Sequence, residues 1–228
     1  MSELESNIEK SLIDQLTLGV SQWTYRPDIK NTEQLWENFR TKLNQNNIGV
    51  LRGQEITDLE MEQIKAYMAE QGASTYKAAL WLAGEHGIAQ IPLVREDASL
   101  GTVSLMAINN REVAGGHSSY EVINQFSPSD ADRDRRFDVS LLVNGIPLVH
   151  IELKNQDHPY MDAFRQIQKY CREGQFRGLF SFVQMFVVSN GTDTKYIASN
   201  INGEMGEKFL TSWVDEENKR VNGYLDFA

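Results

Sequence analysis

The chain has 228 residues, 41% of them hydrophobic, with a formal net charge of −10 and a single cysteine, Cys171. The hydrophobic fraction excludes a chain that is disordered by default, and the length fits one large domain, or one domain with an appendage. An acidic chain repels a polyanion on average, so composition alone argues against nucleic-acid binding unless a local basic surface or a basic partner is present.

The N-terminal segment MSELESNIEK is acidic and polar, without the apolar stretch of a secretory signal peptide. No apolar run approaches the roughly 20 residues that cross a bilayer. One cysteine can form neither an internal disulfide nor a cysteine-based zinc site. We therefore expect a soluble, cytoplasmic protein that does not contact a membrane.

Three helices are predicted in the first part of the chain from apolar residues at helical spacing. They cover residues 3–17, residues 32–44 and residues 57–72. Ser2 and Glu5 form a capping box at the start of the first helix, and Thr57 and Glu60 form one at the start of the third. The apolar faces are Ile8, Leu12 and Leu16; Leu35, Phe39 and Leu43; and Leu59, Ile64 and Met68.

Beyond residue 90 the pattern changes to short strands. These are predicted at residues 91–94, 102–108, 120–126, 182–188 and 195–199, with a hairpin at 137–155 and a helix at 159–172. Strand, helix and strand over residues 148–188 make a βαβ unit. The tail around residues 211–220 is expected to be helical or loosely ordered. Together these elements predict an α/β fold with a central mixed sheet.

The predicted hairpin, FDVSLLVNGIPLVHIELKN, carries two carboxylates and an ammonium group in the most strand-like segment of the chain. Because side chains alternate along a strand, Glu152 and Lys154 share one face of its second strand. A strict two-residue turn at Asn144-Gly145 would pair Asp138 with Ile151 and send the two acids to different faces. One bulge or a three-residue loop would instead set Asp138 opposite Glu152, so a functional grouping of the acids predicts an irregular hairpin.

Two carboxylates about 4 Å apart repel by roughly 4 kcal/mol at an effective dielectric of about 20, which a design for stability alone would avoid. Such a pair is suited to bind a divalent cation that prefers oxygen ligands. The cation can polarise a phosphoryl oxygen and activate water, and Lys154 can stabilise the charge that develops on the phosphate. A structural ion-pair cluster is the alternative, since E-x-K also occurs at Glu217-Asn218-Lys219 in the polar tail.

The helix after the hairpin adds Gln166 and Tyr170, which lie one turn apart and side by side. They are either surface residues or part of the same site. His150 shares a strand face with Glu152, but the four histidines lack metal-ligand spacing. We interpret His150 as a hydrogen-bonded flanking residue and not as a ligand.

The hairpin, followed by the Q-x-x-x-Y of Gln166 and Tyr170 and by FVVSNGTDTKYIA, closely resembles the N-terminal nuclease domain of type I restriction enzyme R subunits. ESNIEKSLIDQL at residues 5–16 and YEVINQF at residues 120–126 resemble that family's first helix and the strand before its catalytic hairpin. The resemblance spans about residues 5–198, is dense over 120–198 and is weak over 20–115. The joint occurrence of these motifs, in order, is what makes it specific.

The resemblance implies a PD-(D/E)xK endonuclease, with a restriction-endonuclease-like mixed sheet flanked by helices, that cuts DNA with Mg²⁺ or its substitute Mn²⁺. Asp138 and Glu152 would be the metal-binding acids, the backbone carbonyl of Leu153 a further metal ligand, and Lys154 the catalytic lysine. Phe137 stands where the motif has a proline, a departure expected to affect strand geometry more than chemistry.

The resemblance also implies supporting residues on two helices. A glutamate of the first helix would assist the metal, with Glu9 as the first choice and Glu5 as the second. Gln166 and Tyr170 would contact either DNA or the catalytic lysine.

R subunits of this family resemble ATP-driven DNA translocases, yet these 228 residues contain no G-x-x-x-x-G-K-[ST] phosphate loop. We therefore expect residues 1–228 to be the endonuclease domain, with a core at about 90–200, of a longer subunit whose ATP-dependent motor lies beyond Ala228. Double-stranded DNA and the modification and specificity subunits are the implied partners. Basic residues expected to form a positive rim at the site are Arg133, Arg135, Arg136, Lys154, Arg165 and Lys169.

Two other functions stay open from the sequence. One is a non-catalytic DNA-binding or subunit-docking module that keeps the nuclease fold. The other is a related DNA repair or junction nuclease, which would act on branched DNA without ATP. The intact set of Asp138, Glu152 and Lys154 favours the restriction endonuclease.

Overall fold

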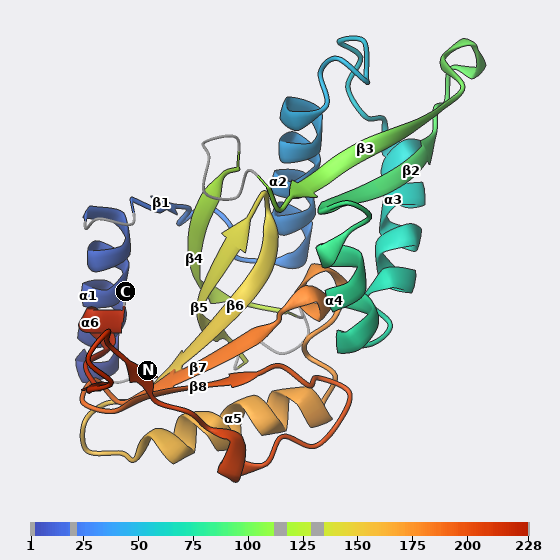
Figure 1. Cartoon of the computed structure of the whole chain (residues 1–228). Coiled ribbons are helices and arrows are strands. Elements are labelled where there is room, and N and C mark those ends of the chain that lie inside the picture. The colour runs from blue at the N-terminus through green and yellow to red at the C-terminus, as the bar shows by residue number, and fades with distance from the viewer. Residues whose placement is uncertain (1–2, 19–21, 112–117, 129–134, 228) are drawn as a thin grey trace.

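A mixed six-stranded sheet forms the centre of the fold in the computed structural model, which describes residues 3–18, 22–111, 118–128 and 135–227 (Figure 1). Its strand order is β1 (Thr24–Tyr25), β4 (Tyr120–Phe126), β5 (Phe137–Val143), β6 (Ile146–Leu153), β7 (Met185–Ser189) and β8 (Thr194–Ala198). β1 runs parallel to β4 and β6 parallel to β7, whereas the other neighbours are antiparallel. The predicted α/β class is confirmed.

Different helices cover the two faces of this sheet (Figure 1). α1 (Glu3–Leu18) packs on one face, where Leu12 joins Val139 and Ile151 in a buried cluster. α5 (Tyr160–Arg172) contacts β6 and β7 on the other, where Ile167 and Phe186 belong to the main core. Since alternate strand residues point to opposite faces, β5 and β6 have apolar cover on both sides. Charged side chains in these strands are therefore taken out of water.

A smaller layer beside the sheet consists of a hairpin and three helices. They are α2 (Thr32–Asn46), α3 (Asp58–Gln71), α4 (Thr75–Ala83), β2 (Ile88–Val94) and β3 (Thr102–Asn109). β2 and β3 pair antiparallel in a sheet of their own and contact the three helices. A buried ion pair, 2.7 Å between Arg95 Nε and Glu60 Oε1, joins the end of the hairpin to the first turn of α3. The 3-10 helix η2 (Gly178–Phe182) contacts α2, α3, α4 and β6, and so connects this layer to the sheet.

The three predicted helices, the strands and the βαβ unit β6–α5–β7 are confirmed. Thr57 and Glu60 form the expected capping box, whereas Ser2 of the other box lies outside the described residues. In the described part of the chain, no helix is long and apolar enough to cross a membrane.

Several elements differ from the predictions. β1 and α4 were not predicted, and the strand expected at 182–188 begins only at Met185, after η2. The prediction for the tail is wrong. β9 (Trp213–Val214) pairs with β10 (Arg220–Val221), and the short helix α6 (Tyr224–Phe227) follows. Asp215 stabilises the turn between β9 and β10, because its Oδ1 accepts hydrogen bonds from the N–H groups of Glu217 and Lys219. Two further 3-10 helices, η1 (Ala98–Leu100) and η3 (Glu207–Phe209), lie in connections.

Candidate functional site

The β5–β6 hairpin turns through Asn144 and Gly145, whose φ angles of +50° and +80° suit a two-residue type I′ turn. The Asn144 side chain accepts the Ser119 N–H at 2.8 Å and donates to the Ala107 carbonyl at 3.0 Å. A Cβ added at Gly145 would lie 3.1 Å from Phe39 Cα, so α2 packs directly on the turn. The turn is therefore fixed in both length and position.

A bulge next to this turn sets the register of the acids. The strands pair in one register near the turn and in another beyond it: Leu142 with Pro147, then Leu141 with Val149. Leu148 is the extra residue. Continuing the outer register from Val139 and Ile151 places Asp138 opposite Glu152. The predicted irregularity is confirmed, and it takes the form of a bulge together with a two-residue turn.

The two acids lie close together and are held from different sides. Asp138 is half-buried, and its Oδ2 accepts the backbone N–H of Leu153 at 2.9 Å. Glu152 is fully buried, with Oε2 3.2 Å from His150 Nε2 and Oε1 3.8 Å from Lys154 Nζ. This Oε1 receives no hydrogen bond from the described part of the chain. A buried carboxylate oxygen without a donor is costly unless something else occupies the place of the donor.

Burial raises the pKa of Glu152 to about 8, although the positive charge of Lys154 and a hydrogen bond with the Asp138 side chain act in the opposite direction. The α1 residues Glu5 and Glu9 raise this pKa further. Burial likewise raises the pKa of Asp138 well above its usual value, and repulsion from Glu152 adds to the effect. Groups whose charge is so poorly solvated bind either a proton or a cation.

Lys154 is held by a chain of hydrogen bonds from α5. Its Nζ donates to Gln166 Oε1 at 2.7 Å, and Gln166 Nε2 donates to the Tyr170 hydroxyl at 2.8 Å. That hydroxyl donates to the Arg136 carbonyl at 3.2 Å, at the start of β5. Of the two roles left open, the contact to the lysine is present for Gln166, and Tyr170 reaches the lysine only through Gln166.

Glu9 approaches the site from α1 through amide groups and not directly. Its Oε1 accepts from Asn124 Nδ2 and its Oε2 from Gln125 Nε2, both at 2.6 Å. Gln125 Nε2 also lies 3.5 Å from Asp138 Oδ1. Glu9 is thus buried and one side chain removed from the acid pair.

Gln125 is a site residue that the sequence did not reveal. It lies inside β4 with φ at +50°, in the left-handed region that a strand residue with a long side chain rarely adopts. This conformation lets neighbouring side chains, those of Asn124 and Gln125, both reach Glu9. Strict strand alternation would have placed them on opposite faces, which is why YEVINQF gave no signal.

The arrangement suits a hard divalent cation that is partly solvated. Among the described residues, no group of three or more His, Cys, Asp or Glu side chains is placed to hold a metal ion. Asp138 and Glu152 therefore offer two carboxylates, and a cation would complete its shell with backbone and water oxygens, as Mg²⁺ commonly does. The unpartnered Oε1 of Glu152 fits this use.

Comparison with known proteins decides the family. The sequence model described as "Type I restriction enzyme R protein N terminus" matches residues 2–204. The chain belongs to this family. It is 35% identical over 200 residues to the type I restriction enzyme SsaAORF53P endonuclease subunit of Staphylococcus saprophyticus. The aligned region covers 88% of this chain and 20% of that protein.

Other relatives of this R-protein family cover nearly the whole chain. The SauMSSORF170P endonuclease subunit of Staphylococcus aureus is 33% identical over 98% of this chain and 22% of its own length. The EcoprrI endonuclease subunit of Escherichia coli is 30% identical over 98% of this chain and 68% of its own length. The chain thus spans about a fifth of the staphylococcal relatives.

The basic rim predicted for this R-protein domain is largely paired. Arg135 contacts Glu173, Arg165 donates to Asp162, and Lys154 faces Glu152. Arg136 and Lys169 are exposed, whereas Arg133 lies outside the described residues. The local positive charge at the site is therefore smaller than the count of basic residues suggests.

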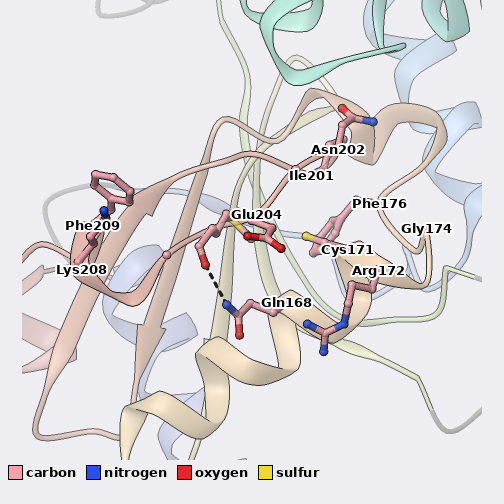
Figure 2. Close-up of a pocket in the computed structure, with 13 residues that line it drawn as sticks. Gln168, Cys171, Arg172, Gly174, Phe176, Ile201, Asn202, Glu204, Lys208 and Phe209 are labelled. Carbon is pink, nitrogen blue, oxygen red and sulfur yellow. Dashed lines mark hydrogen bonds between the residues drawn. The ribbon is translucent and has the colours of Figure 1, made fainter.

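A cavity of about 900 Å³ lies elsewhere, between the C-terminal half of α5 and the loop at residues 201–209 (Figure 2). Gln168 Nε2 crosses it to donate to the Met205 carbonyl at 2.8 Å. Its lining includes Cys171 and Arg172 but none of the residues that the R-protein resemblance singles out. The acid pair is thus separate from this cavity.

Proposed function

We propose that this chain is the Mg²⁺-dependent DNA endonuclease domain of a type I restriction-modification system. In this proposal, it hydrolyses phosphodiester bonds of unmodified double-stranded DNA in the cytoplasm, after ATP-driven translocation by a motor outside this chain. Modification and specificity subunits would supply recognition. The observation that carries the proposal is the convergence of Asp138, Glu152 and Lys154 at a buried carboxylate oxygen that has no hydrogen-bond donor among the described residues, within a chain of the R-protein family.

In the proposed site the cation would be held by the carboxylates of Asp138 and Glu152 and the backbone carbonyl of Leu153. When bound, Mg²⁺ supplies Lewis-acid polarisation of a phosphoryl oxygen and makes water easier to deprotonate; Mn²⁺ can replace it. The oxygen of a water molecule forms a bond to phosphorus while one ester P–O bond breaks; the attacking water gives up a proton, and the leaving oxygen takes one up to become a hydroxyl group. Lys154, fixed by Gln166 at 2.7 Å, stabilises the negative charge that builds on the phosphate oxygens.

Within the protein, the supporting residues keep these groups in place. Tyr170 and Gln166 orient the ammonium group of Lys154 from α5. Gln125 and Glu9 hold Asp138 from the opposite helix layer. A site fixed from two sides in this way loses little entropy when it binds a phosphate, which supports a catalytic role.

A non-catalytic docking module is the second candidate. It is favoured by the net charge of −10 and by the pairing of Arg135 and Arg165 with acids, since both weaken the attraction of DNA. Metal binding separates the two functions, because a docking module has no need for a cation at the acid pair.

Millimolar Mn²⁺ or Mg²⁺ is expected to raise the free energy of unfolding of this chain by about 1–3 kcal/mol. The cation replaces the missing donor at Glu152 Oε1 and relieves the repulsion between the acids. Thermal unfolding with and without metal measures the effect. Asp138→Ala should abolish it, whereas Asp162→Ala, which removes a more exposed carboxylate of α5, should retain it. Equal melting with and without metal in the wild-type chain favours the docking module.

Gln125→Gly is expected to weaken Mn²⁺ binding by about tenfold while it leaves the free energy of unfolding within about 1 kcal/mol of the wild-type value. Glycine relieves the strain at φ +50°, which offsets the loss of the amide contacts to Glu9 and Asp138. Calorimetric titration and urea unfolding measure the two quantities. Arg52→Gly, at φ +51° in a turn, is the control and should leave Mn²⁺ affinity unchanged. Unchanged affinity in Gln125→Gly contradicts a positioning role.

A further inference from the structure

His150 lies beneath the acid pair in an aromatic enclosure. Its side chain is fully buried, and its ring centroid is 4.8 Å from that of Phe137, 5.5 Å from that of Phe176 and 6.2 Å from that of Phe186. A charged imidazole is unfavourable in such apolar surroundings, so the ring is neutral and carries one proton. Which nitrogen carries that proton is then decided by the hydrogen-bond partners.

Both ring nitrogens have a single polar side-chain partner. Nδ1 is 3.1 Å from the Ser140 hydroxyl, on the residue that pairs with His150 across β5 and β6. Nε2 is 3.2 Å from Glu152 Oε2. Ser140 and Glu152 are themselves buried, so neither contact is exchanged for water. The three side chains form one hydrogen-bonded row on the α5 side of the sheet, and the imidazole also interacts with the backbone of Val139.

The ionised form of Glu152 fixes every proton in this row. A carboxylate only accepts hydrogen bonds, so His150 must donate from Nε2. Nδ1 is then without a proton and accepts from the hydroxyl of Ser140. The Ser140 hydroxyl can either donate or accept, so the carboxylate of Glu152 selects the tautomer and Ser140 supplies the donor that Nδ1 then needs.

We propose that His150 is a positioning residue for the cation: its Nε2–H anchors Glu152 Oε2, so that Oε1 stays turned towards Lys154 and free to bind a metal, and the Ser140 hydroxyl donates to Nδ1 in the tautomer that makes this anchor. The inference rests on the proposed function, because it needs a cation at the acid pair. It differs from the earlier interpretation of His150 as a passive flanking residue. It also assigns a supporting role to Ser140, which nothing in the sequence pattern singles out.

His150→Leu is expected to weaken the binding of Mn²⁺ to this chain by about 10–100-fold, and Ser140→Ala by a smaller factor in the same direction. His150→Gln keeps an N–H donor near Oε2 and should stay within about threefold of the wild-type affinity, on the same reasoning. Calorimetric titration with MnCl₂ gives the dissociation constants. Wild-type affinity in His150→Leu overturns the positioning role, whereas a wild-type chain that binds no Mn²⁺ overturns the proposed function as well.

A second measurement does not depend on the folding of any variant. Nitrogen-15 NMR of the Mg²⁺-saturated wild-type chain distinguishes a protonated from an unprotonated ring nitrogen in His150. The expected spectrum has Nε2 protonated and Nδ1 not. In Ser140→Ala the Nε2–H tautomer should persist, because the carboxylate of Glu152 sets it. A wild-type His150 protonated at Nδ1 alone contradicts the proposal.

Discussion

Glu152→Gln is expected to make the protein more stable and inactive at the same time. Burial raises the pKa of Glu152 from 4.5 to about 8, so the folded state binds its proton more tightly than the unfolded state does. The stability that this proton gives is complete below pH 4.5 and is lost as the pH rises from about 4.5 to 8. A glutamine never ionises and avoids this loss. We expect a gain of roughly 2–4 kcal/mol in the free energy of unfolding at pH 9 and almost none at pH 4.

Urea unfolding of both proteins at pH 4, 6 and 9 measures this gain. Glu62→Gln, which changes an exposed glutamate of α3, is the control and should follow the wild-type curve. DNA cleavage by the full-length subunit that the proposed function implies should fall to background in Glu152→Gln, because a neutral amide is a poor cation ligand. Wild-type and Glu152→Gln curves that stay parallel across this pH range contradict the assigned cause.

Lys154→Ala is expected to reduce double-strand cleavage by the complete restriction enzyme by about 10²–10⁴-fold, with ATP hydrolysis retained. The ammonium group is held at 2.7 Å from Gln166 and 3.8 Å from Glu152, where it can act on a phosphate beside the acids. A motor outside this chain does not need it. Cleavage and ATP hydrolysis are assayed separately on the same preparation.

Lys219→Ala is the matched control, because it removes the exposed lysine of the second E-x-K, in the C-terminal tail. It should cleave DNA close to the wild-type rate. Loss of both activities in Lys154→Ala would mean that this lysine supports the fold or the coupling between subunits. Wild-type cleavage in Lys154→Ala would exclude the lysine from the chemistry.

The sequence predicts the parts of the site that follow from local periodicity. Asn144-Gly145 indicates the hairpin, and strand alternation puts Glu152 and Lys154 on one face. The need to group the acids then predicts an irregular turn or a bulge, which the structure places at Leu148. The one-turn spacing of Gln166 and Tyr170 also predicts that they lie side by side, and they do so under Lys154. In each case, covalent geometry over a few residues decides the arrangement.

What the sequence does not predict depends on contacts between distant segments. The left-handed conformation of Gln125 makes sense only once α1 brings Glu9 against β4. Ser140 is an ordinary strand residue until the register sets it beside His150. The two-residue strand β1 is defined by its pairing with β4, a segment about 95 residues further along the chain. Such features need the assembled sheet, and composition and spacing carry little trace of them.

The extra residue Leu148 has a consequence for how this hairpin tolerates change. The Asn144-Gly145 turn is locked against α2, so a deletion or insertion between the turn and His150 cannot be absorbed there. It would instead exchange inside for outside along the rest of β6 and carry Glu152 away from Asp138. For this segment, the number of residues is therefore a stricter requirement than their identity. Homologues in which its apolar residues vary freely should still keep its length.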